Sequence, residues 1–178
     1  MSFLVNTLGK WKVGKLFQQN RRIPEALNLE RIESAILVCN ITDSQSYKEV
    51  QDFATYLKRS EGLSSVKVIC YFDQKEKPTF VNEESDLVFG KKDCNIFGLP
   101  NKVEYNFKKP VDLLVDFTSK SCVPTNYFIC QINAKTVVGK QDDEKGDWFD
   151  LIIDIPKEKG LPVYKENILR YLKMINKA

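Results

Sequence analysis

Continuous apolar runs alternate along this chain with segments whose apolar positions recur every three or four residues. The first run, Ser34–Ile41, is typical of a strand buried on both faces. Ser46–Ser60 follows with apolar residues at helical spacing, and Ser65–Phe72 is rich in β-branched and aromatic residues. These three segments predict a strand–helix–strand unit with a right-handed crossover.

The same alternation continues to the C-terminus. The further predicted strands are Asp86–Phe89, Val111–Phe117, Lys135–Val138 and Trp148–Ile155, and the further helices are Pro124–Ile132 and Pro162–Asn176. Between them, Lys91–Lys102 and Gln141–Asp147 contain Gly or Pro among polar residues and predict loops. Strands that alternate with helices predict a mainly parallel sheet covered on both faces. We therefore expect an α/β fold, a three-layer Rossmann-like (flavodoxin-like) sheet of five or six strands.

A basic segment precedes the first predicted strand. Its spacing predicts an amphipathic helix over Ser2–Asn20 and then a tether that contains Pro24. We expect residues 1–30 to form this helix and tether, and residues 31–178 to form a single α/β domain. Residues 1–22 carry five of the 27 basic residues and no acidic one. The remainder of the chain therefore contains 22 basic residues and all 24 acidic residues. The net charge of +3 therefore resides in the N-terminal segment, and the nearly neutral body argues against nucleic-acid binding.

The apolar side of the N-terminal helix has two interpretations. Aromatic and aliphatic residues beside basic ones are typical of a helix that lies in the interface of an anionic membrane. The same stripe could instead pack on the domain, or on a second copy of the chain in a homo-oligomer. The residues assigned to this membrane or partner helix are Phe3, Leu4, Leu8, Lys10, Trp11, Lys12 and Lys15.

The composition limits the chemistry open to any site. The 178 residues include no His, which excludes Ser-His-Asp and Cys-His nucleophiles and His-containing metal sites. The five cysteines form no CxxC pair, so we predict buried thiols and no metal site. No glycine-rich dinucleotide or P-loop signature is present, and no cofactor is predicted.

Neither a signal peptide nor an apolar run of the ~20 residues needed to span a membrane is recognised. We expect a cytoplasmic protein, associated with the inner face of the membrane if its N-terminal helix binds lipid.

The carboxyl ends of the predicted strands are where we expect a ligand. Open parallel sheets bind ligands there, near the point at which the strand order reverses. Hydroxyls, Lys120 and exposed amides at a helix start follow Val111–Phe117 and could bind an anion, or could form a capped helix beside a solvated lysine. Asp116 could be catalytic or cap a turn, and Cys122 could be reactive or structural. The ligand-binding candidates are Asp43, Asp73, Asp116, Thr118, Ser119, Lys120, Ser121 and Cys122.

Two resemblances add to this picture. The segments SAILVCNITD, VKVICYFDQKEKP, KKDCNIFGLPN, VDLLVDFTSKSCVPTNYF, KTVVGK and FDLIIDI resemble a small family of bacterial α/β proteins without an assigned function. Val111–Gly139 is similar to part of the N-terminal half of heptosyltransferase-like glycosyltransferases. The matches there are Asp112, Leu113, Asp116, Ala134 and Gly139. This second resemblance implies a shared fold, but the chain lacks room for the nucleotide-sugar domain and lacks a glycine-bearing turn after its first strand.

Two functional hypotheses follow. The leading one is a non-catalytic α/β domain for binding or assembly, peripheral to the membrane through its N-terminal helix. The alternative is a small-ligand-binding protein or enzyme, related to the N-terminal half of a glycosyltransferase, with its site at the carboxyl ends of the strands.

Overall fold

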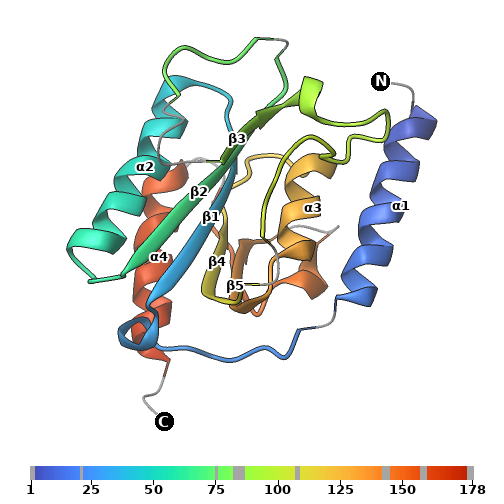
Figure 1. Cartoon of the computed structure of the whole chain (residues 1–178). Coiled ribbons are helices and arrows are strands. Elements are labelled where there is room, and N and C mark those ends of the chain that lie inside the picture. Colours follow the sequence, from blue (N-terminus) through green and yellow to red (C-terminus); the bar gives the residue numbers. More distant parts are fainter. Residues whose placement is uncertain are drawn as a thin grey trace.

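The chain folds around one parallel sheet, as a computed structural model shows (Figure 1). The structure describes residues 3–20, 22–74, 76–81, 87–106, 109–141, 145–156 and 160–175, without the side chains of residues 3–5 and 146. The strands are β1 (Ser34–Asn40), β2 (Ser65–Phe72), β3 (Leu87–Gly90), β4 (Val111–Asp116), β5 (Ala134–Lys140) and β6 (Leu151–Ile153). The helices are α1 (Phe3–Gln19), α2 (Ser44–Arg59), α3 (Val123–Gln131) and α4 (Gly160–Met174). Short 3₁₀ turns are η1 (Leu29–Arg31), η2 (Lys91–Asp93) and η3 (Gly146–Trp148).

The strand order is β3-β2-β1-β4-β5-β6, and all neighbouring strands are parallel. This is the order of the Rossmann fold, whereas flavodoxin-like sheets run 2-1-3-4-5. The chain builds outwards in opposite directions from β1 and β4, so the switch point lies between these two strands. The predicted parallel α/β fold is confirmed, with six strands in the described part of the chain.

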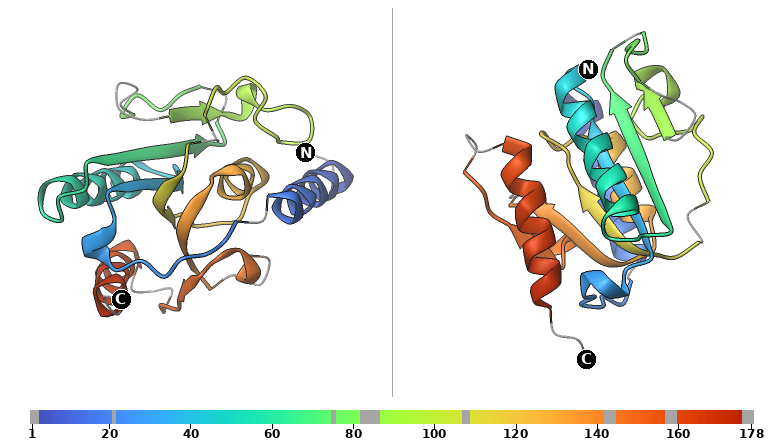
Figure 2. Two further views of the ribbon diagram at one scale, coloured as in Figure 1. Left: turned by 60° about the horizontal axis from the view of Figure 1, so that its bottom comes forward. Right: turned by 90° about the vertical axis from the view of Figure 1, so that its left-hand side faces the viewer.

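Helices cover both faces of the sheet (Figure 2). On one face, α2 and α4 bury apolar side chains such as Phe53, Leu57 and Ile168 against the strands. On the other face, α3 buries Phe128 against Phe89 of β3. The two layers form because the central strands β1 and β4 are apolar on both sides. None of the helices in the described residues is long and apolar enough to cross a membrane.

Helix α1 packs on α3, outside the sheet and its covering layers (Figures 1 and 2). Val13 is buried in this contact, and the ring of Phe17 stacks on Trp148 with centroids 5.2 Å apart. Gly9 permits the close approach, because a Cβ at this position would collide with the carbonyl oxygen of Phe97. The contact face is therefore Gly9, Val13 and Phe17, spaced four residues apart along the helix.

This contact corrects the predicted apolar stripe of the N-terminal helix. Leu8 and Trp11 are 47% and 55% exposed, respectively, so they are not the residues that dock the helix on the domain. The ammonium of Lys15 lies 4.0 Å from the centroid of the Trp11 ring. The side chains of Phe3 and Leu4 lie outside the described residues.

The segment after α1 is bound to the edge of β5. The Glu25 amide donates a hydrogen bond to the Lys135 carbonyl at 2.9 Å, and the guanidinium of Arg22 pairs with Asp150 at 2.7 Å. Arg22 therefore belongs to the domain surface, although the sequence groups it with the basic end of the helix. Arg21 lies outside the described residues.

The last strand is shorter than predicted, because side chains of the residues before it occupy the edge of β5. The expected strand Trp148–Ile155 is reduced to β6. The ring of Phe149 packs directly on Gly139 of β5, where a Cβ would collide with the ring. The Asp150 carboxylate accepts a hydrogen bond from a β5 amide at 2.7 Å. In turn, β5 continues through Gly139 to Lys140 and does not end at Val138. The other predicted elements match within two residues, except that Ser2, Asp86 and Asn176 lie outside the described residues.

Candidate functional site

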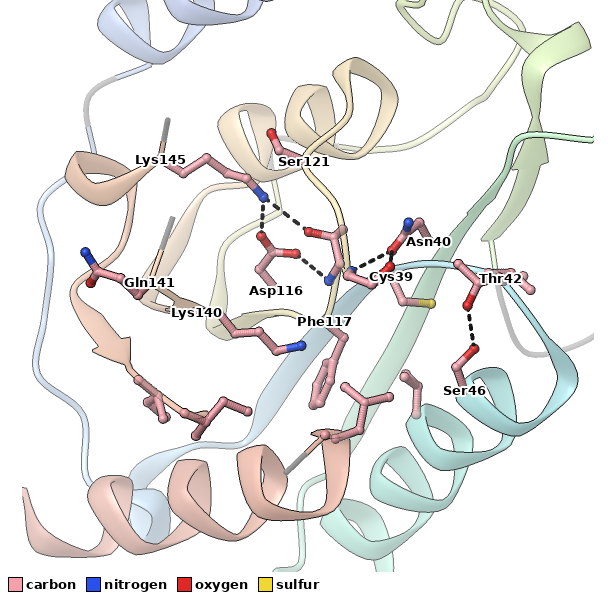
Figure 3. A pocket seen from close by; sticks show the side chains of 18 of the residues that line it. Cys39, Asn40, Thr42, Ser46, Asp116, Phe117, Ser121, Lys140, Gln141 and Lys145 are labelled. Carbon is pink, nitrogen blue, oxygen red and sulfur yellow. Dashed lines mark hydrogen bonds and ion pairs between the residues drawn. The ribbon is translucent and has the colours of Figure 1, made fainter. Parts of the chain in front are cut away.

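A pocket of about 640 Å³ lies at the switch point (Figure 3). The carboxyl ends of β1, β4, β5 and β6 form one side of it, and the first turns of α2 and α4 form the other. Ligand pockets in open parallel sheets occur at this place, and this volume is within their usual range.

A buried ion pair forms the inner wall of the pocket. Asp116 ends β4 and Lys145 precedes η3, and they are 3% and 2% exposed. The Lys145 ammonium lies 2.6 Å from one carboxylate oxygen of Asp116 and donates to the Thr118 hydroxyl at 3.2 Å. The other oxygen of Asp116 accepts the Thr118 amide at 2.8 Å (Figure 3). Each buried charge is therefore compensated and hydrogen-bonded, as burial in a folded protein requires.

Lys140 supplies a second ammonium at the end of β5. Its nitrogen lies 4.8 Å from the centroid of the Tyr164 ring. Burial lowers the pKa of Lys140, and the neighbouring charge of Lys145 lowers it further, against an opposing effect of Asp116. Within the described residues, no ion pair joins Lys140 to a carboxylate.

Asn40 connects the two strands at the switch point. It ends β1, and its side-chain oxygen accepts hydrogen bonds from both the amide and the hydroxyl of Ser119, at 2.8 and 3.2 Å. Ser119 follows β4, so this contact joins the two halves of the sheet at the rim of the pocket. Ser121 also borders the pocket, and its hydroxyl accepts a hydrogen bond from the side-chain amide of Asn126 at 3.0 Å.

Asp43 is the N-cap of α2 and lines neither of the two pockets described here. Its carboxylate accepts the Ser46 amide at 2.7 Å and the Thr42 hydroxyl at 2.9 Å. The hydrogen bond from the Ser46 amide lowers the pKa of Asp43, and the one from Thr42 adds to this effect. Asp43 was a candidate ligand-binding residue, and the structure gives it a capping role at the edge of the site.

A second pocket of about 620 Å³ shares Asn40 with the first as a lining residue. Asp73, Lys120 and Cys122 line this pocket, whereas Ser121 borders both. The Asp73 carboxylate is exposed and lies 3.7 Å from the Lys91 ammonium. The eight candidates are thus divided: Asp116, Thr118 and Ser119 line only the first pocket, and Asp73, Lys120 and Cys122 line only the second.

Burial disfavours the thiolate form of three cysteines, Cys94, Cys122 and Cys130. Cys122 is the N-cap of α3 without a side-chain capping bond, and burial raises its pKa despite hydrogen bonding with Thr125. The raised pKa therefore favours the structural interpretation of Cys122 over the reactive one, because burial outweighs the effect of the helix start. Burial also raises the pKa of Cys94 and Cys130 to about 12.

Sequence reasoning missed both lysines of the first pocket. Lys140 directly follows Gly139, so extending the predicted strand by two residues would have placed it among the strand-end residues. Lys145 lies in a segment predicted as a polar loop, and no local pattern indicates that it is buried. Its neighbours Asp142, Asp143 and Glu144 lie outside the described residues.

A family model described as "Family of unknown function (DUF6913)" matches residues 6–175. The chain belongs to this family. No curated protein and no solved structure matches the chain. Membership confirms the resemblance to a family without an assigned function, whereas the similarity of Val111–Gly139 to glycosyltransferases stays a prediction.

Proposed function

We propose that this protein binds a small organic ligand in the pocket at the switch point between β1 and β4. The observation that carries the proposal is the buried network of Lys145, Asp116 and Thr118, which lines a pocket of about 640 Å³. Its place at the carboxyl ends of the strands is where α/β proteins of this topology hold ligands.

The buried pair is poorly explained by stability alone. Removing two charges from water costs several kcal/mol per ion, and apolar residues of similar volume often stabilise a fold as well or better. A charged pair beside a cavity is better explained by recognition, since it presents fixed polar groups to whatever enters.

The geometry favours binding over catalysis. The Asp116 carboxylate is engaged by Lys145 and the Thr118 amide, and the Ser119 hydroxyl donates to the Asn40 amide oxygen, which is not a base. A serine nucleophile requires a neighbouring general base, and Asn40 cannot provide one.

Blocking the pocket tests this proposal. We expect a small-molecule library, screened by saturation-transfer NMR, to yield ligands of the wild type that the Ser119→Trp variant no longer binds, because the indole fills the rim of the pocket. Ser60→Trp is the matched control, since Ser60 is an exposed serine at the other end of α2. Ligands that bind Ser119→Trp as well as they bind Ser60→Trp would contradict the proposal.

The outward face of α1 supports a second candidate function, contact with an anionic membrane surface. Leu8 and Trp11 are half-exposed there beside Lys15, and the first 22 residues include no acidic side chain. Apolar residues that enter the interface and lysines that pair with anionic lipid are what such binding requires. Five free thiols support a cytoplasmic location for both functions.

The membrane contact is tested better by point variants than by removal of the helix, because removal would also uncover the surface that Val13 occupies on α3. We expect the wild type to float with vesicles of phosphatidylcholine and phosphatidylserine, and Leu8→Gln/Trp11→Gln to remain in solution. Met174→Gln, at an exposed apolar position on α4, is the control. If the double variant instead changes the molar mass measured by light scattering, Leu8 and Trp11 join two copies of the chain.

A further inference from the structure

We propose that the ligand of the first pocket is an amphipathic anion, with a carboxylate or phosphate group beside Lys140 and an apolar body against α2 and α4. This inference rests on the proposed binding function and specifies the class of ligand.

The charges of the inner wall do not balance. Among the described residues, two ammonium groups, Lys140 and Lys145, accompany one inner carboxylate, that of Asp116. Asp154 also borders the pocket, but its side chain is exposed and water screens its charge. In the part of the chain that the structure describes, one positive charge of the inner wall therefore has no carboxylate partner, and an incoming anion would neutralise it.

Lys140 is the group that this anion would meet. Lys145 already contacts Asp116 and Thr118, whereas Lys140 has the face of the Tyr164 ring beside its ammonium. An aromatic face attracts an ammonium and fixes its position without neutralising it. The lowered pKa of Lys140 agrees with this picture, because burial disfavours the charged ammonium and an anion beside it would favour that form. Figure 3 shows the amines of Lys140 and Lys145 reaching from separate segments towards the end of β4.

The rest of the pocket suits an apolar body. Ile41, Val50, Phe117, Ile153 and Leu161 line it where α2 and α4 cover the sheet. In Figure 3 the Phe117 ring lies on the α4 side of the buried ion pair. Burial of apolar surface on this side and an ion pair with Lys140 on the other would orient a ligand that has both parts.

Probes with the same apolar chain separate the contribution of the anionic group from that of the chain. We expect isothermal titration to show octanoate or octyl phosphate binding to the wild type, and octan-1-ol binding at least about tenfold more weakly, since a hydrogen bond to a charged group contributes that much. Comparison of octanoate with octyl phosphate distinguishes the two anionic groups. Added salt should weaken binding of the anions and leave octan-1-ol unaffected.

Lysine variants assign the effect to one residue. Lys140→Met should weaken binding of the anion about tenfold or more without changing the affinity for octan-1-ol. Lys140→Arg should retain most of the affinity for the anion, because the positive charge is kept. Lys67→Met, at an exposed position on β2, is the matched control. Circular dichroism and the urea midpoint verify that each variant is folded.

Three results would overturn the ligand class: octan-1-ol binding as tightly as the anions, equal effects of Lys140→Met and Lys67→Met, or no binding of either anion at millimolar concentration. Each leaves the pocket itself open to other ligands found in the library screen. If an anion instead binds Ser119→Trp as tightly as it binds the wild type, the proposed function is contradicted, because the anion then binds outside the first pocket.

Discussion

The two aspartates of β4 have the same side chain, and each contacts a lysine, yet they differ in what surrounds them. Asp112, at the amino end of the strand, lies 2.9 Å from the Lys135 ammonium, and Asp116, at the carboxyl end, lies 2.6 Å from that of Lys145. The Lys135 side chain is 43% exposed, whereas that of Lys145 is 2% exposed. Water therefore weakens the first pair and is excluded from the second.

The two ends of the strand also use their carboxylates differently. Asp112 accepts hydrogen bonds from the amides of Glu33 and Ser34 and from the Ser34 hydroxyl, at 2.9–3.1 Å, and so holds the start of β1 beside β4. Asp116 lines a pocket and holds a lysine from a distant segment. The end of the strand at which it lies, and not the residue type, therefore separates a structural carboxylate from one at a candidate site.

Breaking the buried pair should have the largest effect on stability. We expect Lys145→Met to lower the free energy of unfolding by about 3–5 kcal/mol, because it leaves the Asp116 charge buried without a counter-charge. Urea denaturation at pH 7 measures this loss. The double variant Lys145→Met/Asp116→Asn should recover a large part of it, since no buried charge is then left unpaired.

Asp112→Asn should have a smaller effect that depends on pH. Burial raises the pKa of Asp112, but hydrogen bonds from Lys135, Ser34 and Glu33 outweigh burial and hold the pKa below its ordinary value of 3.8. A carboxylate whose pKa is lowered by folding stabilises the fold at pH values above its ordinary pKa. This stabilisation disappears as the pH falls through the folded-state pKa. We expect Asp112→Asn to cost about 1 kcal/mol at pH 7.

Urea denaturation over a series of pH values tests this predicted pH dependence. The difference between wild type and Asp112→Asn should be constant above 3.8 and shrink in more acidic solution. A difference that grows in acid would contradict the role given to Asp112.

Lys135→Met should have the smallest effect of the three. The hydrogen bond with Asp112 raises the pKa of Lys135, but the ammonium is open to water, which replaces the lost contact. We expect no resolvable change in the urea midpoint at pH 7. Together with Lys145→Met this variant isolates the effect of burial, because the same substitution is then made in two ion pairs of similar length. Equal losses would show that burial does not separate them.

The patterns that could be read from the sequence are those with local causes. Ser34–Asn40 is recognisable as a buried strand because its side chains face helices on both sides, and Asp43 is recognisable as a cap because its carboxylate bonds to an amide three residues later. The candidates after β4 were found by topology, since the carboxyl ends of parallel strands share one edge. Asp116, Thr118 and Ser119 accordingly lie together in the pocket.

Other features depended on contacts between distant segments. The docking face of α1 is set by Gly9 and Val13, because the loop at Phe97 leaves space only for a residue without a side chain. The more conspicuous Trp11 stays exposed. Hydrophobicity alone ranks Trp11 above Gly9, and only the shape of the partner surface reverses that order.

Short windows of the sequence were enough to predict the α/β class, the parallel sheet and the edge of the sheet at which the first pocket lies, because strand burial and helix periodicity repeat within such windows. Contacts between distant segments were needed to reveal that Lys145 is buried against Asp116, 29 residues away, and that Lys140 shares the same pocket. The cost of burying a charge depends on what lies beside it in space, and a polar loop has the same local sequence whether its lysine meets water or a carboxylate.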